Sequence, residues 1–222
     1  MISYNDKEKS YFSNVRTDLI KLLPKESTLY IIALVAGAVD TLVAIKGKGL
    51  ASEVVGVELN ELPHSNQKNQ LIDRFIFANI EKDQLDLPEN YFDVIVYGDI
   101  LEHLVDPWKS IDETIKYLRH GGYFIVSLPN IRHIRAAYQI FLKGSFAYQA
   151  HGIFDKTHMR FFCKKDMLDL LEGHNRSIHK IIPNFALQEN VPKKLKIINT
   201  LTFRMFEGFL ATQFLFVGRK FK

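Results

Sequence analysis

The stretch YFDVIVYGDILEHLVDPWKSIDETIKYLRHGGYFIVSLPN, residues 91–130, decides the fold of this chain. It holds two continuous apolar runs, residues 94–96 and 123–126, and such runs are typical of parallel strands that are covered on both faces. Between them lies a helical pattern that Pro107 can open, because the first turn of a helix needs no backbone donor there. The glycine pair at 121–122 is expected to end that helix. The stretch therefore predicts a strand–helix–strand unit.

Polar side chains follow the first of these strands. Asp99, Glu102 and His103 come directly after the apolar run. In an open parallel sheet, ligands bind in the crevice beyond the carboxyl ends of the strands, so these groups are expected to face it. His103 is the candidate catalytic base, because the unperturbed pKa of histidine lies near neutrality. The competing interpretation makes His103 a hydrogen-bonded scaffold at the start of the helix.

The rest of the chain continues the alternation of strands and helices. Further strands are predicted by the apolar runs at residues 29–35, 53–59, 75–78, 178–185 and 212–218. Helices are predicted at residues 11–23, from residue 40, after residue 130, at 164–171 and at 195–210. Such alternation favours an α/β sheet with helices on both faces.

The composition suits a globular chain with one domain, residues 1–222. Hydrophobic residues make up 47% and charged residues 24%, which are ordinary values for a soluble protein. No apolar run approaches the ~20 residues of a membrane span, and the first ten residues lack a secretory apolar core. The single cysteine, Cys163, excludes an intrachain disulfide and a multi-cysteine zinc site. We therefore expect a cytoplasmic protein with no integral membrane segment.

Positive charge gathers toward the C-terminal end of the sequence. The formal net charge is +4, and from Val191 onward seven Lys or Arg residues stand against one acid, Glu207. Such a segment suits an anionic partner or a membrane surface, but a solvated helix face with a charged chain end is the favoured interpretation. No pair of predicted strands interleaves basic with aromatic residues, so no nucleic-acid partner is expected.

Three motifs carry a resemblance to a known family: GDILEHLVDPW at residues 98–108, LRHGGYFIVSLPN at 118–130 and GIFDKTHMRFF at 152–162. With them the chain resembles class I S-adenosylmethionine-dependent methyltransferases, in the form of the small bacterial proteins labelled methyltransferase type 11, 12 or 23. The resemblance implies a Rossmann-like, seven-stranded, mostly parallel α/β sheet with helices on both faces. It also implies an antiparallel edge strand at residues 212–218 and a small substrate-side insertion at residues 142–162.

The resemblance implies S-adenosylmethionine as the cofactor and assigns residues to it. Glu58, at the end of the second strand, stands where the family holds the ribose hydroxyls, as dinucleotide folds do. The other cofactor-binding positions are Asn79 and Ile80 at the adenine, Gly37 and Ile100 at the methionine moiety, and Asp99 on the sulfonium side. Asn79 replaces the usual acid, but its amide oxygen can still accept from the adenine amino group.

The turn after the first strand departs from the family pattern. Ala33 stands at the usual acid, and Val35 and Val39 stand at two of the three usual glycines, so Gly37 alone is kept. A β-branched valine resists positive φ and fills space that a ligand needs, and an alanine offers the cofactor no hydrogen bond. Each loss costs ~1–3 kcal/mol, so the sequence predicts weakened cofactor binding. The alternative is that other contacts suffice and the loop still binds.

The motif at residues 152–162 supplies candidate substrate ligands. His158 and Arg160 suit an anionic group of the acceptor, or, as an equal alternative, they form an internal polar network with Asp155. His151 and His158 are seven residues apart with no third ligand at a suitable spacing, so no metal site is expected.

The sequence thus favours a methyltransferase homologue that acts on a small molecule or a sugar-like metabolite. The changes at Ala33, Val35 and Val39 keep a second function open, that of a catalytically inactive relative which serves as a binding or assembly module. A nicotinamide oxidoreductase is disfavoured, because the EHL stretch at residues 102–104 and the D-x-T-H-x-R-F-F segment fit the methyltransferase pattern.

Overall fold

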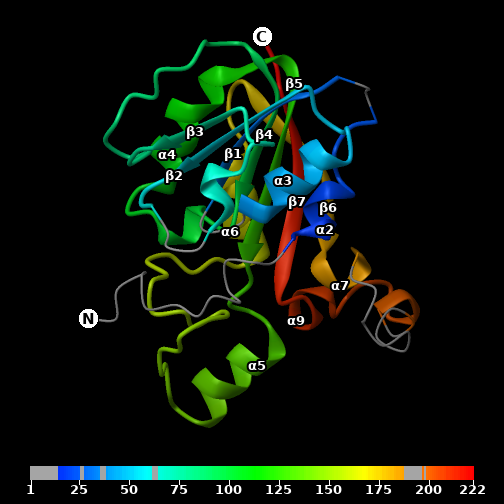
Figure 1. Ribbon diagram of the computed structural model, residues 1–222. Coiled ribbons are helices and arrows are strands. Elements are labelled where there is room, and N and C mark those ends of the chain that lie inside the picture. The colour runs from blue at the N-terminus through cyan, green and yellow to red at the C-terminus, as the bar shows by residue number, and fades with distance from the viewer. Residues whose placement is uncertain (1–14, 26–27, 36–38, 62–64, 188–196, 198) are drawn as a thin grey trace.

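One twisted sheet forms the centre of the molecule (Figure 1). The computed structural model describes residues 15–25, 28–35, 39–61, 65–187, 197 and 199–222. The strands are β1 Tyr30–Val35, β2 Glu53–Glu58, β3 Arg74–Phe77, β4 Phe92–Gly98, β5 Leu118–Pro129, β6 Arg176–Pro183 and β7 Gln213–Lys220. They form a seven-stranded sheet in the order β3-β2-β1-β4-β5-β7-β6.

The pairing of the strands confirms the predicted fold class. Neighbours from β3 through β5 are parallel, and among the described strands β7 alone runs against its neighbours, β5 and β6. The antiparallel strand lies at the expected end of the sheet, but β6 is outermost, because β7 inserts between β5 and β6. The chain leaves β1 toward β2 and returns on the other side at β4, so the crevice is expected at the carboxyl ends of β1 and β4.

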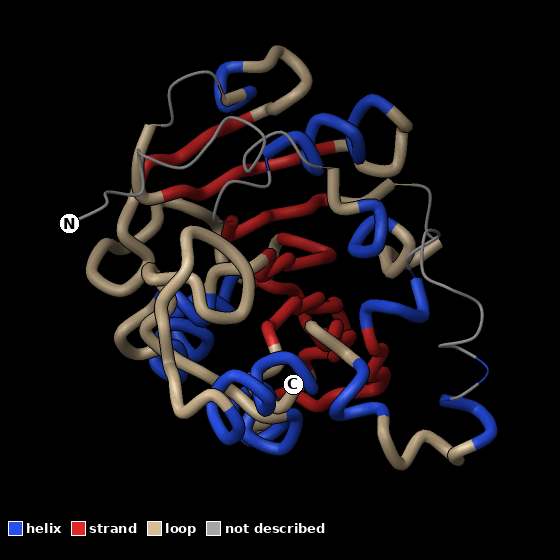
Figure 2. The backbone as a smooth tube through the Cα atoms, turned by 90° about the horizontal axis from the view of Figure 1, so that it is seen from below, coloured by secondary structure: helices blue, strands red, loops and turns tan. Residues whose placement is uncertain are grey.

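Helices cover both faces of this sheet (Figure 2). The described α-helices are α2 Thr17–Ile20, α3 Val39–Gly47, α4 Pro107–Thr114, α5 Ile134–Ala137, α6 Lys164–Leu171, α7 Asn184–Leu187 and α9 Glu207–Leu210. Short turns of other helix types are η2 Asn66–Lys68, η3 Leu101–His103, η4 Ile115–Tyr117 and the π-helical η5 Tyr138–Leu142. One face of the sheet packs against α4 and α6, and the other packs against α2 and α3.

Neighbouring residues of β1 serve opposite faces of the sheet. Ile32 and Leu34 lie in the core cluster that includes side chains of α4 and α6. Ile31 and Ala33 lie in the cluster that includes side chains of α2 and α3. Because successive side chains of a strand point to opposite faces, a strand covered on both sides must be apolar throughout. This requirement explains why continuous apolar runs mark the strands in the sequence.

The helix of the 91–130 stretch is shorter than predicted. α4 ends at Thr114, and β5 already begins at Leu118. Gly121 and Gly122 therefore lie within β5 rather than at a helix end, and Gly121 has a φ of 75°. The pairing of β5 with β4 shifts register between Leu118 and Tyr123, so the glycine pair accommodates an irregularity of the strand.

The helix predicted at residues 195–210 is interrupted. Residues 197 and 199–201 are helical, but the chain then turns at Phe203 and Arg204, whose φ values of 48° and 62° lie in the left-handed region. α9 starts only at Glu207. Burial alone would raise the pKa of Glu207, but hydrogen bonds from Arg204 and Lys164 outweigh burial and hold this pKa below its ordinary value. The ion pairs of Glu207 thus fasten the interrupted segment to the start of α6.

The segment between β5 and α6 projects beyond the carboxyl ends of the parallel strands (Figure 1). α5 and η5 leave large apolar side chains in solvent, and Ile134, Phe141 and Leu142 are 55%, 81% and 76% exposed. The chain then returns to the sheet, where Phe162 forms a bridge with Asn130. The expected insertion at residues 142–162 therefore lies at this end of the molecule. Within the described residues, no helix has the length and apolar character that crossing a membrane requires.

A close approach of two strands gives a test of the core. A Cβ added to Gly218 of β7 would lie 2.1 Å from the ring of Phe124 on β5. We expect Gly218→Ala to lower the free energy of unfolding by about 1–3 kcal/mol, the usual cost of overpacking. Gly47→Ala is the control, because its Cβ would meet only Leu71 at 3.6 Å, and it should be neutral or stabilise by up to ~1 kcal/mol. Urea denaturation measures both, and equal midpoints would contradict the packing argument.

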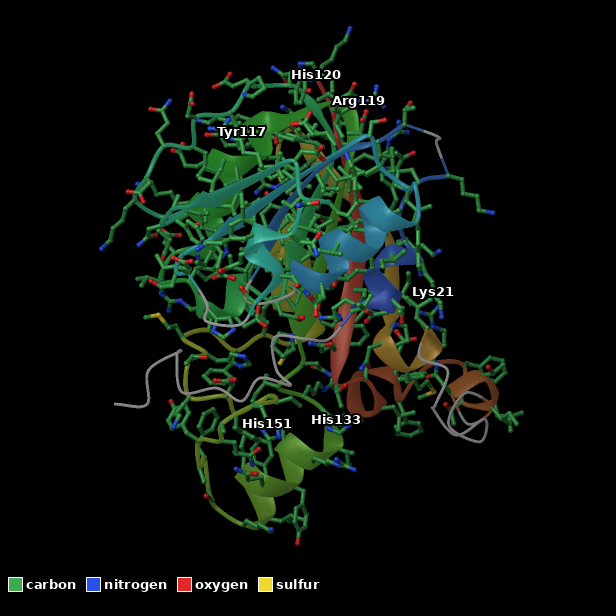
Figure 3. All side chains as sticks on the ribbon, in the orientation of Figure 1. Lys21, Tyr117, Arg119, His120, His133 and His151 are labelled. Atoms are coloured by element: carbon green, nitrogen blue, oxygen red, sulfur yellow. The ribbon has the colours of Figure 1, made fainter. Side chains whose placement is uncertain are left out.

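The stability of the folded chain should depend on pH through His133 at the start of α5. His133 is 7% exposed, and its Nδ1 accepts a hydrogen bond from the backbone of Arg135 at 3.3 Å (Figure 3). Burial, together with the charge of Arg135, lowers the pKa of His133 from its ordinary value of 6.5. The folded state therefore binds fewer protons than the unfolded state, and stability is lost as the pH falls from above 6.5 through the lowered pKa.

We expect His133→Gln to reduce this loss of thermal stability between about pH 7.5 and pH 5. His151→Gln, at an exposed position of the same projecting segment, should behave as the unaltered chain does. Melting curves of the three proteins across this range decide the matter, and identical pH dependence in all three would show that His133 does not cause the loss.

Candidate functional site

Three predicted site residues meet at one edge of the sheet. Glu58 is the last residue of β2, Asn79 follows β3, and Asp99 follows β4. Because β2, β3 and β4 belong to the parallel part of the sheet, their carboxyl ends lie at the same edge. The positions that the family resemblance assigns to the cofactor therefore converge at this edge.

A cavity of about 220 Å³ opens at this edge. Its lining includes five of the residues assigned from the sequence, together with Thr157 of the returning insertion: Glu58, Asn79, Ile80, Ile100 and His103. Ile80 and Ile100 are 8% and 9% exposed and provide apolar walls. The cavity thus combines apolar surface with a carboxylate, an amide and an imidazole, which is the usual make-up of a small-molecule site.

The two polar residues at the β2 and β3 ends already make local hydrogen bonds. Glu58 is 5% exposed, and its Oε1 accepts from the backbone N–H of Leu59 at 3.1 Å. The amide oxygen of Asn79, which was expected to serve the adenine, accepts from the N–H of Glu81 at 2.9 Å. The backbone N–H of Asn79 donates to the carboxylate of Asp83 at 2.7 Å. These bonds fix the turn that brings Ile80 to the cavity.

Asp99 is held by the protein itself rather than facing the cavity. Its Oδ2 accepts from the guanidinium of Arg16, and its Oδ1 accepts from Ser127 at 2.5 Å and from Gln213 at 3.0 Å. Asp99 has a φ of 54° and is absent from the cavity lining, although its neighbour Ile100 lines it. The position assigned to the sulfonium side is therefore occupied by an internal polar network, and the cofactor role of Asp99 stays a prediction.

Arg16 reaches the site edge from the segment before β1. Its guanidinium also donates to Asp18 at 2.9 and 3.0 Å and to Ser127 at 3.1 Å. Its backbone N–H donates to Thr41 of α3 at 3.0 Å. The sequence analysis did not predict Ser127 and Gln213 as site residues. Only their positions near the ends of predicted strands could have indicated them, because these strand ends lie at the same edge of the sheet as Asp99.

The changed turn after β1 is only partly described. Gly37 lies outside the described residues, and of Val35 only its place at the end of β1 is defined. Ala33 and Val39 are 2% and 1% exposed and pack in the apolar core. In the described part of the turn, apolar packing thus stands where the family pattern has an acid and a glycine.

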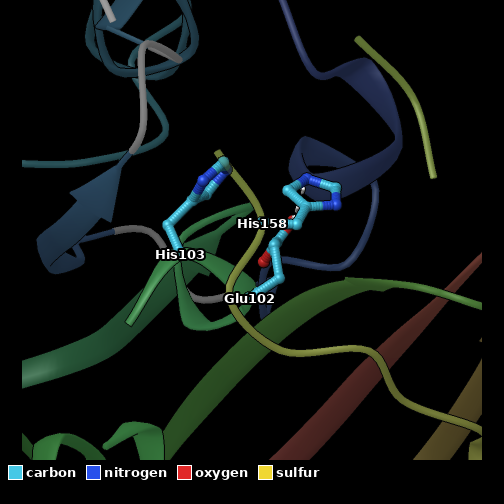
Figure 4. Close-up of side chains that lie close together, drawn as sticks. All are labelled: Glu102, His103 and His158. Carbon is cyan, nitrogen blue, oxygen red and sulfur yellow. Dashed lines mark ion pairs between the residues drawn. The ribbon is translucent and has the colours of Figure 1, made fainter. Parts of the chain in front are cut away.

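His103 and His158 come together beside the cavity (Figure 4). Their ring centroids are 4.8 Å apart, and His158 Nε2 lies 3.9 Å from Oε1 of Glu102. Each Nδ1 lies 3.1 Å from a backbone carbonyl oxygen, that of Thr157 for His103 and that of Ile153 for His158. The two imidazole rings are therefore in edge-to-face contact beside the cavity.

Arg160 does not point where the sequence placed it. Its Nε donates to the carbonyl oxygen of Val105 at 3.0 Å, its Nη2 donates to the same oxygen, and its guanidinium lies 5.8 Å from the ring centre of Trp108. Arg160 is also absent from the cavity lining. The long side chain thus braces the segment before α4, and a substrate-binding role for Arg160 stays a prediction. Asp155 accepts instead from the N–H and hydroxyl of Thr157.

Comparisons with known proteins agree with this architecture. Residues 35–126 match the model of a family described as "Methyltransferase domain". A curated relative, the "Probable S-adenosylmethionine-dependent methyltransferase" of Mycolicibacterium smegmatis, is 32% identical over 83 residues, which cover 36% of this chain and 31% of the relative. The matched part therefore spans only about a third of that relative's length.

Two solved structures share the fold. The S-adenosylmethionine-dependent methyltransferase from Mesorhizobium loti superposes with a TM-score of 0.60 at 18% identity, covering 92% of this chain and 96% of that one. The 1,6-didemethyltoxoflavin-N1-methyltransferase of Burkholderia thailandensis superposes with a TM-score of 0.59 at 16% identity, covering 93% and 78%. The resemblance stated from the sequence motifs is thus confirmed.

The Arg16–Asp99 ion pair should contribute measurably to stability. The two side chains are only 15% and 23% exposed, so Arg16→Met leaves a half-buried carboxylate without its charged donor. We expect a loss of about 1–3 kcal/mol in the free energy of unfolding. Arg74→Met is the matched control, because Arg74 and its partner Asp86 are 46% and 101% exposed, and it should cost less than ~1 kcal/mol. Guanidinium denaturation measures the free energy of unfolding of both variants. Equal losses would mean that the Arg16–Asp99 pair contributes no more to stability than an exposed ion pair.

Proposed function

We propose that this chain, which has the fold of the class I S-adenosylmethionine-dependent methyltransferases, is a methyltransferase homologue with a small-molecule acceptor and weakened cofactor binding. One observation carries the proposal. Strand ends that are distant in sequence bring Glu58, Asn79 with Ile80, Ile100 and His103 to one cavity at the carboxyl edge. Ligands of open α/β sheets bind at that edge.

The adenosine half of the cofactor fits the residues present. Glu58 places a buried carboxylate at the end of β2, where an acceptor for two ribose hydroxyls belongs. Ile80 and Ile100 offer flat apolar contact for a base. Asn79 is the weaker member, because its amide oxygen already accepts from Glu81. We assign Glu58, Asn79, Ile80 and Ile100 to this half.

The amino-acid half fits less well. Ala33 brings no carboxylate, Val39 fills core space, and Asp99 is engaged by three protein donors. A ligand that needs these positions must replace protein hydrogen bonds instead of gaining new ones. Weakened binding follows from this arrangement, and with it comes the second candidate function, a methyltransferase-fold binding or assembly module.

When bound, the cofactor supplies an electrophilic methyl group. The residues of this chain contribute orientation and exclusion of water: Glu58 holds the nucleoside end, and Ile80 and Ile100 close the cavity wall. His103 faces the cavity with its Nδ1 held by the carbonyl of Thr157, so its Nε2 is the basic nitrogen. A base at this point is needed only when the acceptor atom carries a proton.

The acceptor is a small molecule or a sugar-like metabolite. The cavity volume of about 220 Å³ suits part of a small ligand rather than a macromolecular surface. The structural neighbour from Burkholderia thailandensis holds 1,6-didemethyltoxoflavin and S-adenosylhomocysteine, so one protein of this fold accommodates a small acceptor beside the spent cofactor. His158 is proposed to position the acceptor through His103, whereas Arg160 stabilises the segment around Val105.

Titration calorimetry with S-adenosylmethionine and S-adenosylhomocysteine tests the proposed cofactor site. We expect dissociation constants weaker than roughly 1 μM, and a further loss of about 10–100-fold in Glu58→Gln, because a charged hydrogen-bond acceptor is lost. Glu61→Gln, at an exposed position of the loop after β2, should bind as the unaltered chain does. Tight binding by the unaltered chain refutes the weakening, and equal binding by Glu58→Gln refutes the assigned site.

Restoring the family pattern should strengthen cofactor binding and lower the thermal stability of the chain. The triple variant Ala33→Glu, Val35→Gly and Val39→Gly is expected to bind S-adenosylmethionine at least roughly tenfold more tightly. Its melting temperature should fall, because Ala33 and Val39 are 2% and 1% exposed and their replacement disturbs the apolar core. Calorimetry and melting curves of both proteins give the two readouts, and a stable variant that binds no better would contradict the argument.

Transfer of a labelled methyl group separates the enzyme from the binding module. With labelled S-adenosylmethionine and a pool of small metabolites, an enzyme moves label into the low-mass fraction. A module that binds the cofactor without moving label supports the second function, and His103→Gln controls for the proposed base.

A further inference from the structure

We infer that Glu102, His103 and His158 form a binding site for one divalent transition-metal ion at the wall of the cavity. One ligand atom from each residue lies within 4.8 Å of the other two. Figure 4 shows the side chains of Glu102, His103 and His158 close together, with the ion pair between Glu102 and His158 dashed. This inference concerns metal binding and holds whether or not the chain transfers methyl groups.

The distances are close to those of a loaded site. His158 Nε2 and Glu102 Oε1 are 3.9 Å apart. Ligands of a tetrahedral zinc ion, each about 2.0–2.2 Å from the metal, lie roughly 3.3 Å from one another. The ligand atoms lie up to 4.8 Å apart. Side-chain rotation must therefore shorten these separations by as much as about 1.5 Å to complete the coordination.

Both imidazoles are oriented as metal ligands are. Nδ1 of His103 lies 3.1 Å from the carbonyl oxygen of Thr157, and Nδ1 of His158 lies 3.1 Å from that of Ile153. A carbonyl oxygen can only accept, so each Nδ1 carries the proton, and each Nε2 is the unprotonated nitrogen, the form in which histidine binds a metal. Backbone carbonyls that fix the tautomer in this way are the common outer partners of metal-bound histidine.

The backbone holds the ligand-bearing segments together. The carbonyl oxygen of Glu102 accepts from the N–H of Met159 at 2.8 Å and from that of Arg160 at 3.0 Å. The Arg160 side chain ties the same two segments through Val105. Glu102 and His158 are thus adjacent before any ion arrives, which lowers the cost of forming the site.

Burial supplies a reason for a cation. Glu102 is 1% exposed and His158 is 9% exposed. A buried carboxylate must be compensated by a proton, a cationic partner or a metal. The competing arrangement is therefore a metal-free network in which Glu102 pairs with protonated His158, and the experiment must tell the two apart.

The ligand set selects the class of ion. Two imidazoles and one carboxylate suit Zn²⁺ and Fe²⁺, whereas Mg²⁺ and Ca²⁺ prefer oxygen ligands alone. Three protein ligands leave a coordination position open, and His103 borders the cavity. If the proposed function holds, a hydroxyl of the acceptor can occupy that position and become more acidic, and His103 then acts as a ligand rather than as a base.

The sequence search missed this site because it looked for a third ligand near His151 and His158. The other two ligands, Glu102 and His103, stand in the loop after β4, 56 and 55 residues before His158 in the chain. His151 is not part of the cluster, and it lies on the projecting segment (Figure 3).

The experiment titrates the full chain, first stripped with a chelator, with Zn²⁺ by calorimetry. We expect one ion per chain, and at least roughly tenfold weaker binding in Glu102→Gln, His103→Gln and His158→Gln. His151→Gln is the matched control and should leave the affinity unchanged, because this histidine is exposed on the same segment. Affinity should also fall at acid pH, since protons compete for the imidazoles.

A second measurement needs no variant, in case a buried substitution prevents folding. Co²⁺ added to the unaltered chain should give the strong visible bands of a four- or five-coordinate ion, and Zn²⁺ should abolish them. Weak six-coordinate bands, no stoichiometric Zn²⁺ binding, or equal affinity in folded Glu102→Gln and His158→Gln would overturn the site in favour of the metal-free network. Cofactor titration of the same samples separates this failure from failure of the proposed function.

Discussion

The carboxylate of Asp99 is the constraint on which the arrangement of the site depends. It accepts hydrogen bonds from Arg16 before β1, Ser127 in β5 and Gln213 in β7, so one side chain joins four parts of the chain. These contacts hold Asp99 in the left-handed region, a conformation that a non-glycine residue keeps only when its surroundings enforce it. The chain turns sharply there, and the following residues bring Ile100 and His103 to the cavity wall. A polar network at the end of β4 thus sets the position of the loop that carries Ile100 and His103.

The fold could be predicted from the sequence because its central strands, such as β1 and β4, are buried on both faces. Such burial demands continuous apolar runs, and these are visible without any knowledge of tertiary contacts. Glu58 and Asn79 could also be placed, since Glu58 ends β2 and Asn79 closely follows β3. The predicted helix end at Gly121 was wrong, because strand pairing overrides the local pattern there. Gly121 lies within β5, at the place where the pairing of β5 with β4 shifts register.

The site could be predicted only in part, because its decisive contacts join distant residues. Gln213 meets Asp99 across 114 positions, and no spacing rule points to such a pair. Arg160 has the alternation expected of a crevice residue, yet its guanidinium finds the carbonyl of Val105. The meeting of Glu102 with His158 likewise depends on how the insertion folds back onto the loop after β4. The residue types at these positions indicated polar roles, but the sequence did not show in which direction each side chain points.

The placement of β7 has a consequence for how the protein is made. β7 is the last described strand along the chain, yet it lies between β5 and β6, and β6 pairs with no other strand of the described sheet. While the ribosome is still adding residues 213–220, β5 has an open edge and β6 has no neighbour. That half of the sheet must therefore assemble after translation has passed its final strand, and until then its apolar edges are exposed to aggregation or to chaperones.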